Sequence, residues 1–160
     1  MEDLLNALGL QHATLAAAES CTAGLAADYI VRVPGASRVF WGSYVCYTIE
    51  AKQKMLDVPG ELIENHGAVS RPVALAMAEG ALEKSGSSWA FSVTGLAGPG
   101  GGTRETPLGT VWIGIAWREG QGVLRSEARV FLFSGSRSDI REAAAAAALE
   151  ELLNKIPQGK

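Results

Sequence analysis

The pattern of apolar and polar positions predicts helices and strands that follow one another along the chain. Apolar residues at positions 4, 5, 8 and 10 have the spacing of a short amphipathic helix. Short runs rich in apolar, β-branched and aromatic residues predict strands further along. The expected strands lie at 13–18, 42–49, 89–94, 109–117 and 123–133, and the later helices are expected at 21–33, 50–56, 70–86 and 141–153.

The order of these elements predicts a mixed sheet that is covered on both faces. Strands alternate with helices in the first part of the chain, and the last two strands are joined by residues 118–122 as a hairpin. Because neither a repeat nor a linker divides the sequence, we predict a single α/β domain over residues 1–160. The segment 95–108 shows no periodicity, and a loop of that length in a compact domain is usually functional or disordered.

Composition narrows the class of protein. The chain has 160 residues, 48% of them hydrophobic, and a net charge of −3, which suits a globular core and gives no basic surface for nucleic acid. No apolar run reaches the roughly 18 residues of a membrane-spanning helix. Cys21 and Cys46 have neither metal-ligand spacing nor a disulfide framework. We therefore expect a soluble cytoplasmic protein with reduced thiols, no metal, and no membrane or nucleic-acid partner.

The segment "AESCTAG", residues 18–24, places hydrogen-bonding and reactive side chains where a predicted strand gives way to a helix. Ser20 there could expose its hydroxyl near a helix N-terminus, where backbone N–H groups could stabilise an oxyanion. Position alone favours a simpler interpretation, in which Ser20 or Thr22 is the helix N-cap. Cys21 is an alternative nucleophile, although neither histidine of the chain lies in a recognisable cysteine-hydrolase context.

A second candidate is "YTIEAK", in which Tyr47 closes a predicted strand and Lys52 opens the following helix. A lysine can act as the base for a serine if burial lowers its pKa from about 10.4 toward neutrality. Tyr47 would then relay a proton or hold the lysine by a hydrogen bond. The alternative is an exposed lysine beside a half-buried tyrosine, which is the commoner situation for such a pair.

The aperiodic segment is dense in glycine, with five glycines between positions 95 and 102. Glycine clusters let the backbone approach a ligand and direct N–H groups at an anion, although a flexible hairpin loop is the alternative. The segment follows a predicted strand, which is where ligands bind in open α/β sheets. Its spacing matches neither a Walker loop nor a dinucleotide fingerprint. Arg137 and Arg141 share one face of a later helix, where they clamp a phosphate or form an exposed stripe.

Six segments occur in order over roughly residues 10–153. They are "AESCTAG", "PGAS", "YTIEAK", "HGAVS", "TGLAGPGGGT" and "FSGSRSDIR". Together they resemble the CinA C-terminal domain family, whose catalytically defined members are nicotinamide-nucleotide amidases. The resemblance implies a three-layer α/β/α fold and the hydrolysis of nicotinamide mononucleotide to nicotinate mononucleotide and ammonia, without a metal or a cofactor.

Carried over by position, the resemblance implies a catalytic set and a nucleotide site. Ser20 would be the nucleophile, Lys52 its base and Tyr47 the third catalytic residue. Ser20 would attack the amide and release ammonia, and water would hydrolyse the acyl-enzyme. A homodimer is the default for a small α/β enzyme. The residues expected to bind the nucleotide are Thr94, Gly95, Gly98, Gly100, Gly101, Gly102, Thr103, Arg137 and Arg141.

Three positions depart from the family pattern. Ala23 stands in place of the first of two glycines, Ile49 in place of an asparagine, and Thr106 in place of a lysine of the glycine-rich loop. The last two changes remove polar groups near the expected substrate. They leave open a second function, that of a non-catalytic nucleotide-sensing or partner-binding domain. A competence or DNA-damage partner is a third, but the acidic charge argues against direct DNA binding.

Overall fold

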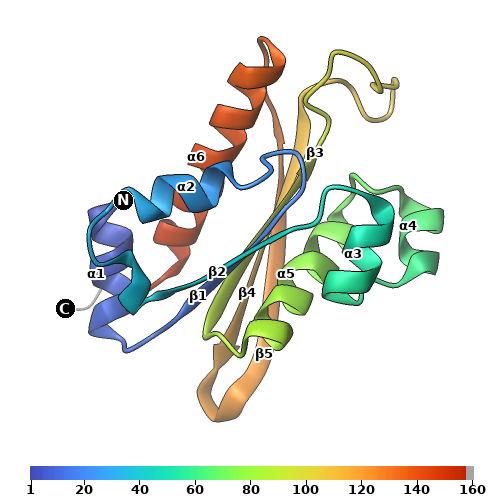
Figure 1. Ribbon diagram of the computed structural model, residues 1–160. Helices are drawn as coiled ribbons and strands as arrows, with labels where there is room; N and C mark the ends of the chain where they lie inside the picture. The colour runs from blue at the N-terminus through green and yellow to red at the C-terminus, as the bar shows by residue number, and fades with distance from the viewer. Residues whose placement is uncertain (158–160) are drawn as a thin grey trace.

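A five-stranded mixed β-sheet forms the middle layer of the molecule, with helices on both of its faces (Figure 1). The computed structural model describes residues 1–157, so positions 158–160 of the predicted domain lie outside the described residues. The strands are β1 (Leu15–Glu19), β2 (Phe40–Val45), β3 (Trp89–Gly95), β4 (Thr110–Glu119) and β5 (Val123–Leu132). The helices are α1 (Glu2–Leu10), α2 (Leu25–Val31), α3 (Ile49–Leu56), α4 (Gly60–His66), α5 (Arg71–Ser85) and α6 (Arg137–Lys155), with 3-10 turns η1 (Ala36–Arg38) and η2 (Gly120–Gly122).

The topology confirms the predicted α/β fold with a mixed sheet. The strand order is β2-β1-β3-β4-β5. β1 runs parallel to β2 and β3, whereas β4 runs antiparallel to β3 and forms the expected hairpin with β5. Helices α1, α2 and α6 cover one face, and α5 covers the other with α3 and α4 beside it (Figure 1). Among residues 1–157, no helix is both long enough and apolar enough to cross a bilayer.

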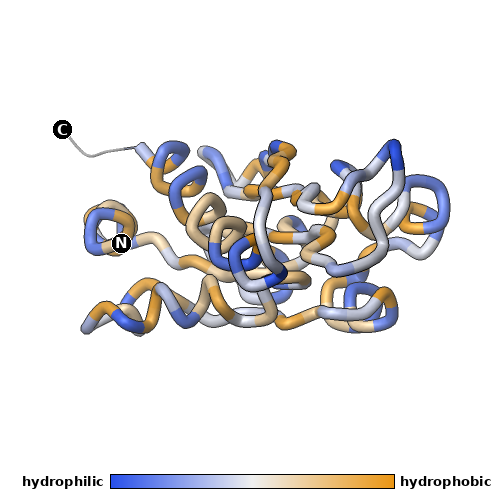
Figure 2. The backbone as a smooth tube through the Cα atoms, turned by 90° about the horizontal axis from the view of Figure 1, so that it is seen from above, coloured by the Kyte–Doolittle hydropathy of each residue, from blue (hydrophilic) through white to orange (hydrophobic). Residues whose placement is uncertain are grey.

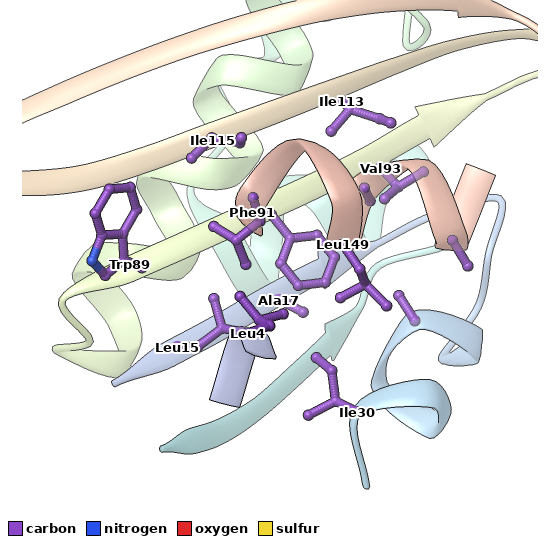
Figure 3. Close-up of a cluster of buried hydrophobic side chains, with 14 of the residues drawn as sticks. Leu4, Leu15, Ala17, Ile30, Trp89, Phe91, Val93, Ile113, Ile115 and Leu149 are labelled. Atoms are coloured by element: carbon purple, nitrogen blue, oxygen red, sulfur yellow. The ribbon is translucent and has the colours of Figure 1, made fainter. Parts of the chain in front are cut away.

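Side chains that alternate along the strands contribute to two cores, one on each face of the sheet. On β1, Leu15 and Ala17 belong to the core under α1, α2 and α6, whereas Ala16 and Ala18 belong to the core under α5. Consistent with burial on both faces, residues 15–18 of β1 form a continuous apolar run. Phe91 of β3 lies in the middle of the first core, between apolar side chains of the sheet and of the helices (Figure 3).

The helices that cover the sheet carry clear start and stop signals. Helix α6 begins with a capping box, in which Ser136 and Asp139 each bind the other's backbone N–H through the side chain. Its run of alanines, 143–148, lets α6 lie close to the sheet. Helix α5 follows Ser70 and ends at Gly86, as predicted. Figure 2 shows hydrophilic and hydrophobic residues alternating along these outer helices.

The predicted strand 42–49 is wrong at its C-terminal end. Strand β2 stops at Val45, and α3 begins at Ile49. The Thr48 hydroxyl accepts a hydrogen bond of 3.1 Å from the Ala51 N–H, which makes Thr48 the N-cap of α3. A local cap therefore ends a segment whose β-branched and aromatic residues favour a strand.

The helix predicted at 21–33 is also shorter than expected. Residues 21–24 form turns, and Gly24, in the left-handed region with a φ of 95°, is the N-cap of α2. Neither Ser20 nor Thr22 caps the helix with its side chain. The carboxylate of Glu19 instead accepts hydrogen bonds from N–H groups at the start of α2. The sequence pattern also missed α4, whose seven residues include a single buried apolar one, Ile63.

Phe91 tests how much of the stability comes from the core under α6. Because this side chain is fully buried, we expect Phe91→Ala to lower the free energy of unfolding by about 3–5 kcal/mol. The measurement is urea denaturation followed by circular dichroism. The matched control is Leu132→Ala on the exposed edge strand, where a change within about 0.5 kcal/mol is expected. Equal losses for the two variants would contradict this assignment of the core.

Candidate active site

The structure brings Ser20 and Lys52 into direct contact. Ser20 follows β1 immediately, and Lys52 lies in the first turn of α3 with its side chain directed inward. Lys52 Nζ lies 2.7 Å from Ser20 Oγ and donates a hydrogen bond of 3.1 Å to the carbonyl oxygen of Cys46. Both residues are buried, with 7% of Ser20 and 2% of Lys52 exposed. The predicted pairing of a serine hydroxyl with a lysine amine is therefore present in the geometry.

Burial sets the protonation state of Lys52. Removal from water disfavours the ammonium form, so the pKa of Lys52 is lowered from its ordinary value of 10.5, with desolvation as the main cause. Among the described residues, no carboxylate forms an ion pair with this amine to restore its charge. The fraction of unprotonated amine near neutral pH is therefore larger than for an exposed lysine, which suits a base.

The turn that carries Ser20 is held by the carboxylate of Glu19, a residue to which the sequence pattern assigned no role. Glu19 is 0% exposed, and its two oxygens accept hydrogen bonds from the N–H groups of Gly24, Ala26 and Ala27 at 2.9–3.1 Å. The hydroxyl of Ser43 on β2 donates a fourth bond, of 3.0 Å. The carboxylate thus occupies N–H groups at the start of α2, which are then not available to an oxyanion.

A cleft of about 230 Å³ lies beside Ser20 at the carboxyl ends of β1 and β3. Ser20 and Lys52 contribute polar groups, and Thr94 and Gly95 contribute the end of β3. Gly95 has no room for a side chain, since a Cβ there would lie 2.6 Å from Val111 Cγ2. The remaining wall is largely apolar and comes from Cys21, Ile49, Ala68, Val69 and Ala97, with Tyr47 and Arg137 also lining the cleft.

Tyr47 does not hold the lysine, which corrects one expectation. Its hydroxyl accepts a hydrogen bond of 2.8 Å from Arg137 Nη2, and 54% of the residue is exposed. Arg137 Nη1 donates a second bond, of 2.6 Å, to the carbonyl oxygen of Gly98 in the glycine-rich loop. Because β2 stops at Val45, Tyr47 lies beyond the sheet and contacts Arg137, while the Cys46 carbonyl binds Lys52.

Several predicted residues lie outside this cleft. The carbonyl oxygen of Gly98 is bound by Arg137, which lines the cleft. The exposed loop between β3 and β4, drawn in yellow in Figure 1, carries Gly100, Gly101, Gly102 and Thr103. Thr94 lines the cleft, but its hydroxyl donates to the carbonyl oxygen of Ala68.

Arg141 contacts the turn that follows Ser20. Its Nε donates to the carbonyl oxygen of Cys21 at 3.0 Å, and its Nη2 donates to that of Thr22 at 2.8 Å. The backbone therefore occupies both of these donors, and we do not assign Arg141 to a phosphate.

Cys21 lines the cleft but is a poor nucleophile. Burial raises the pKa of its thiol to about 11, although backbone N–H groups and the nearby Lys52 offset part of the effect. Burial likewise raises the pKa of Cys46 to about 11. The thiolate is the reactive form, and the raised pKa keeps both thiols almost entirely protonated near neutral pH. Within residues 1–157, no group of three histidine, cysteine or acidic side chains is placed to bind a metal.

A model of the CinA C-terminal domain matches residues 1–156. The chain belongs to this family. It is 51% identical over 140 residues to a putative competence-damage inducible protein of Symbiobacterium thermophilum, an alignment that covers 85% of this chain and 33% of the relative. It is 42% identical over 157 residues to the nicotinamide-nucleotide amidohydrolase PncC of Escherichia coli, covering 98% of this chain and 93% of that protein.

The solved structures agree with this assignment. The competence/damage inducible protein CihA from Agrobacterium tumefaciens superposes on this CinA domain with a TM-score of 0.86 at 37% identity, over 96% of this chain and 93% of the other. The chain thus spans about a third of the length of the first curated relatives and nearly the whole of PncC. The resemblance read from the motifs is confirmed.

The site also contains residues that the sequence analysis missed. Glu19 carried a signal, since it is a charged residue at the end of an otherwise apolar strand that proves to be buried. Ala68 and Val69 line the cleft from the link between α4 and α5 and carried no chemical signal of their own. A small apolar residue in a connecting segment is recognisable as part of a cleft only once the fold is known.

The raised thiol pKa values of this CinA domain predict resistance to alkylation. At pH 8 about one thiol in a thousand is ionised at a pKa of about 11, against about a quarter for a free cysteine. We therefore expect iodoacetamide to leave Cys21 and Cys46 unmodified in the native protein and to modify both in urea. Mass spectrometry of tryptic peptides measures this directly. Rapid modification of Cys21 in the native protein would restore it as a candidate nucleophile.

Proposed function

We propose that this protein is an amidohydrolase that converts nicotinamide mononucleotide to nicotinate mononucleotide and ammonia. The observation that carries the proposal is the contact of 2.7 Å between Ser20 Oγ and Lys52 Nζ, two buried residues that line the cleft. A serine beside a lysine of lowered pKa is an activated nucleophile, and a carboxamide is a substrate for acyl transfer. The name of PncC, which the chain covers almost completely, supports the nucleotide as substrate.

In this proposal Lys52 moves one proton between the reacting groups. As Ser20 Oγ forms a bond to the amide carbon, unprotonated Lys52 accepts the hydroxyl proton. The ammonium then donates a proton to the amide nitrogen, the C–N bond breaks and ammonia leaves. Water attacks the resulting ester and gives a proton to Lys52, which returns it to Ser20 Oγ as the acid is released. Proton transfer by such a base contributes about 10²–10⁴-fold to the rate.

The dimensions of the cleft indicate how a nucleotide is divided between the cleft and its mouth. Its volume of about 230 Å³ is smaller than that of most ligand pockets, so it accommodates the ring that bears the amide rather than the whole nucleotide. Ile49 and Val69 offer apolar contact to a flat ring. The ribose phosphate then extends toward Arg137 and the glycine-rich loop, which meet where Arg137 contacts Gly98. A guanidinium at this place suits a phosphate.

The activity is tested by ammonia release from nicotinamide mononucleotide. We expect Ser20→Ala to abolish turnover without loss of the fold, and Lys52→Arg to be nearly inactive because a guanidinium stays protonated. Since the base acts unprotonated, wild-type turnover rises with pH up to the lowered pKa of Lys52 and is level above it. Cys21→Ala serves as the control and keeps most of the activity. A folded wild type that binds the nucleotide without turnover would favour the non-catalytic alternative.

Arg137 is expected to bind the phosphate. Arg137→Ala should raise KM for nicotinamide mononucleotide by about tenfold or more while changing kcat less, because a charge-assisted hydrogen bond contributes about 1.5–3 kcal/mol. Nicotinamide riboside, which lacks the phosphate, should bind the wild type far more weakly than the nucleotide does. Calorimetry with both ligands on both proteins measures this, and equal affinity of the wild type for the two would remove the phosphate role.

Ile49 is the departure from the family pattern that faces the substrate. It lines the cleft and is 51% exposed, whereas Thr106 is outside the lining and hydrogen-bonds within its loop to Thr103. We expect Ile49→Asn to raise kcat by about 10–100-fold, because a restored hydrogen bond is worth about 1.5–3 kcal/mol. Thr106→Lys is the matched control and should change the rate little. No gain from Ile49→Asn, with strong wild-type activity, would show that position 49 does not limit catalysis.

A further inference from the structure

The short turn that carries Ser20 is bound on two sides by side chains of opposite charge that do not line the cleft. The buried Glu19 carboxylate accepts from the N–H groups of Gly24, Ala26 and Ala27. The Arg141 guanidinium donates to the carbonyl oxygens of Cys21 and Thr22. Each charge thus binds the backbone groups of opposite polarity, and together they fix the turn from its donor side and its acceptor side.

The Glu19 backbone also connects the nucleophile turn to the base. The carbonyl oxygen of Glu19 accepts a hydrogen bond of 2.9 Å from the Cys46 N–H, and the carbonyl oxygen of Cys46 accepts the bond from Lys52 Nζ. Glu19 therefore holds the turn after Ser20 through its side chain. Through its backbone, Glu19 also holds the Cys46 peptide group that binds Lys52. Arg141 reaches the same turn from α6 on the far side of the sheet from α3.

We propose that Glu19 and Arg141 are positioning residues of the reaction, which set the separation of Ser20 Oγ and Lys52 Nζ without touching the substrate. The inference rests on the proposed amidohydrolase function and adds to it. A misplacement of reacting groups by about 1 Å can cost about 10²-fold in rate. The effect of losing the Glu19 carboxylate or the Arg141 guanidinium should therefore appear in the chemical step rather than in substrate binding.

The test uses two readouts, of which one is independent of the nucleotide. The first is kcat and KM for nicotinamide mononucleotide. The second is the rate at which diisopropyl fluorophosphate labels Ser20, in which an Oγ–P bond forms, the P–F bond breaks, fluoride leaves and Lys52 takes the hydroxyl proton. The variants are Glu19→Gln, Glu19→Asp, Arg141→Gln and Arg141→Lys. The matched controls are Glu119→Gln and Arg125→Lys, which alter an exposed ion pair between β4 and β5.

For Glu19→Gln and Arg141→Gln we expect kcat and the labelling rate to fall together by about 10²-fold. KM should stay within about twofold, and the controls should match the wild type. Arg141→Lys keeps the charge but cannot reach both carbonyls equally well, so it should lie between Arg141→Gln and the wild type. The pH midpoint of kcat should be unchanged in Glu19→Gln, because the Glu19 carboxylate is bound by backbone N–H groups of the turn and of α2 and by the Ser43 hydroxyl rather than by Lys52.

Other outcomes overturn the inference. If a Glu19 or Arg141 variant melts at a lower temperature but has the wild-type kcat and labelling rate while folded, the two residues only stabilise the fold. A shifted pH midpoint in Glu19→Gln would show that Glu19 acts through its charge on Lys52. If Glu19→Gln does not fold, Glu19→Asp and Arg141→Gln decide the question. A wild type that is labelled at Ser20 but releases no ammonia would contradict the proposed substrate. The labelling rates of the variants would still show whether Glu19 and Arg141 position Ser20 and Lys52.

Discussion

The site depends on a lysine amine that is buried without a counter-charge. An exposed Lys52 would hold its proton and would be no better a base than any surface lysine. Burial beside Ser20 lowers its pKa, and the Cys46 carbonyl together with the serine hydroxyl satisfies the hydrogen bonds that water would otherwise make. The cost of placing a polar amine there is thus partly offset by two short contacts, and the same contacts fix its direction.

The elements around this amine supply the burial. Helix α3 carries Lys52 in its first turn, and the Thr48 cap sets where that turn begins. Strand β1 ends at Glu19, whose fully buried carboxylate accepts four hydrogen bonds. The hydrogen-bonding capacity of this buried group is therefore also satisfied. A carboxylate and an amine are therefore both buried at this site. Each is held by neutral backbone and hydroxyl groups rather than by the other.

Much of the fold was readable from the sequence, because its signals are local. The apolar run of β1, the flanking Ser70 and Gly86 of α5 and the run of apolar and aromatic residues in β4 all correspond to elements of the structure. The boundaries beside the site were not predicted correctly. Residues 46–48 have strand-like composition, but the Thr48 hydroxyl caps α3 just after them. The Glu19 carboxylate likewise binds N–H groups where α2 begins. Periodicity in the sequence does not encode either contact.

The geometry of the candidate site could be predicted only in part for the same reason. Ser20 and Lys52 are 32 positions apart in the sequence, and residue types alone do not show that α3 turns its lysine back toward β1. Tyr47 and Arg141 were assigned by position, yet Tyr47 binds Arg137 and Arg141 binds the backbone of the nucleophile turn. Which donors remain free for a ligand depends on such tertiary contacts, which a pattern of residue types does not encode.

The sheet topology explains why the cleft lies where it does. β1 lies between β2 and β3 and is parallel to both, and the chain leaves β1 through α2 on one face but reaches β3 through α5 on the other. At such a reversal the connections diverge, and the carboxyl ends of the two strands border a crevice. Ser20 follows one of these strands, and Gly95 ends the other. Ser20 thus lies beside this crevice, and the buried Lys52 reaches it from α3, the next helix after β2.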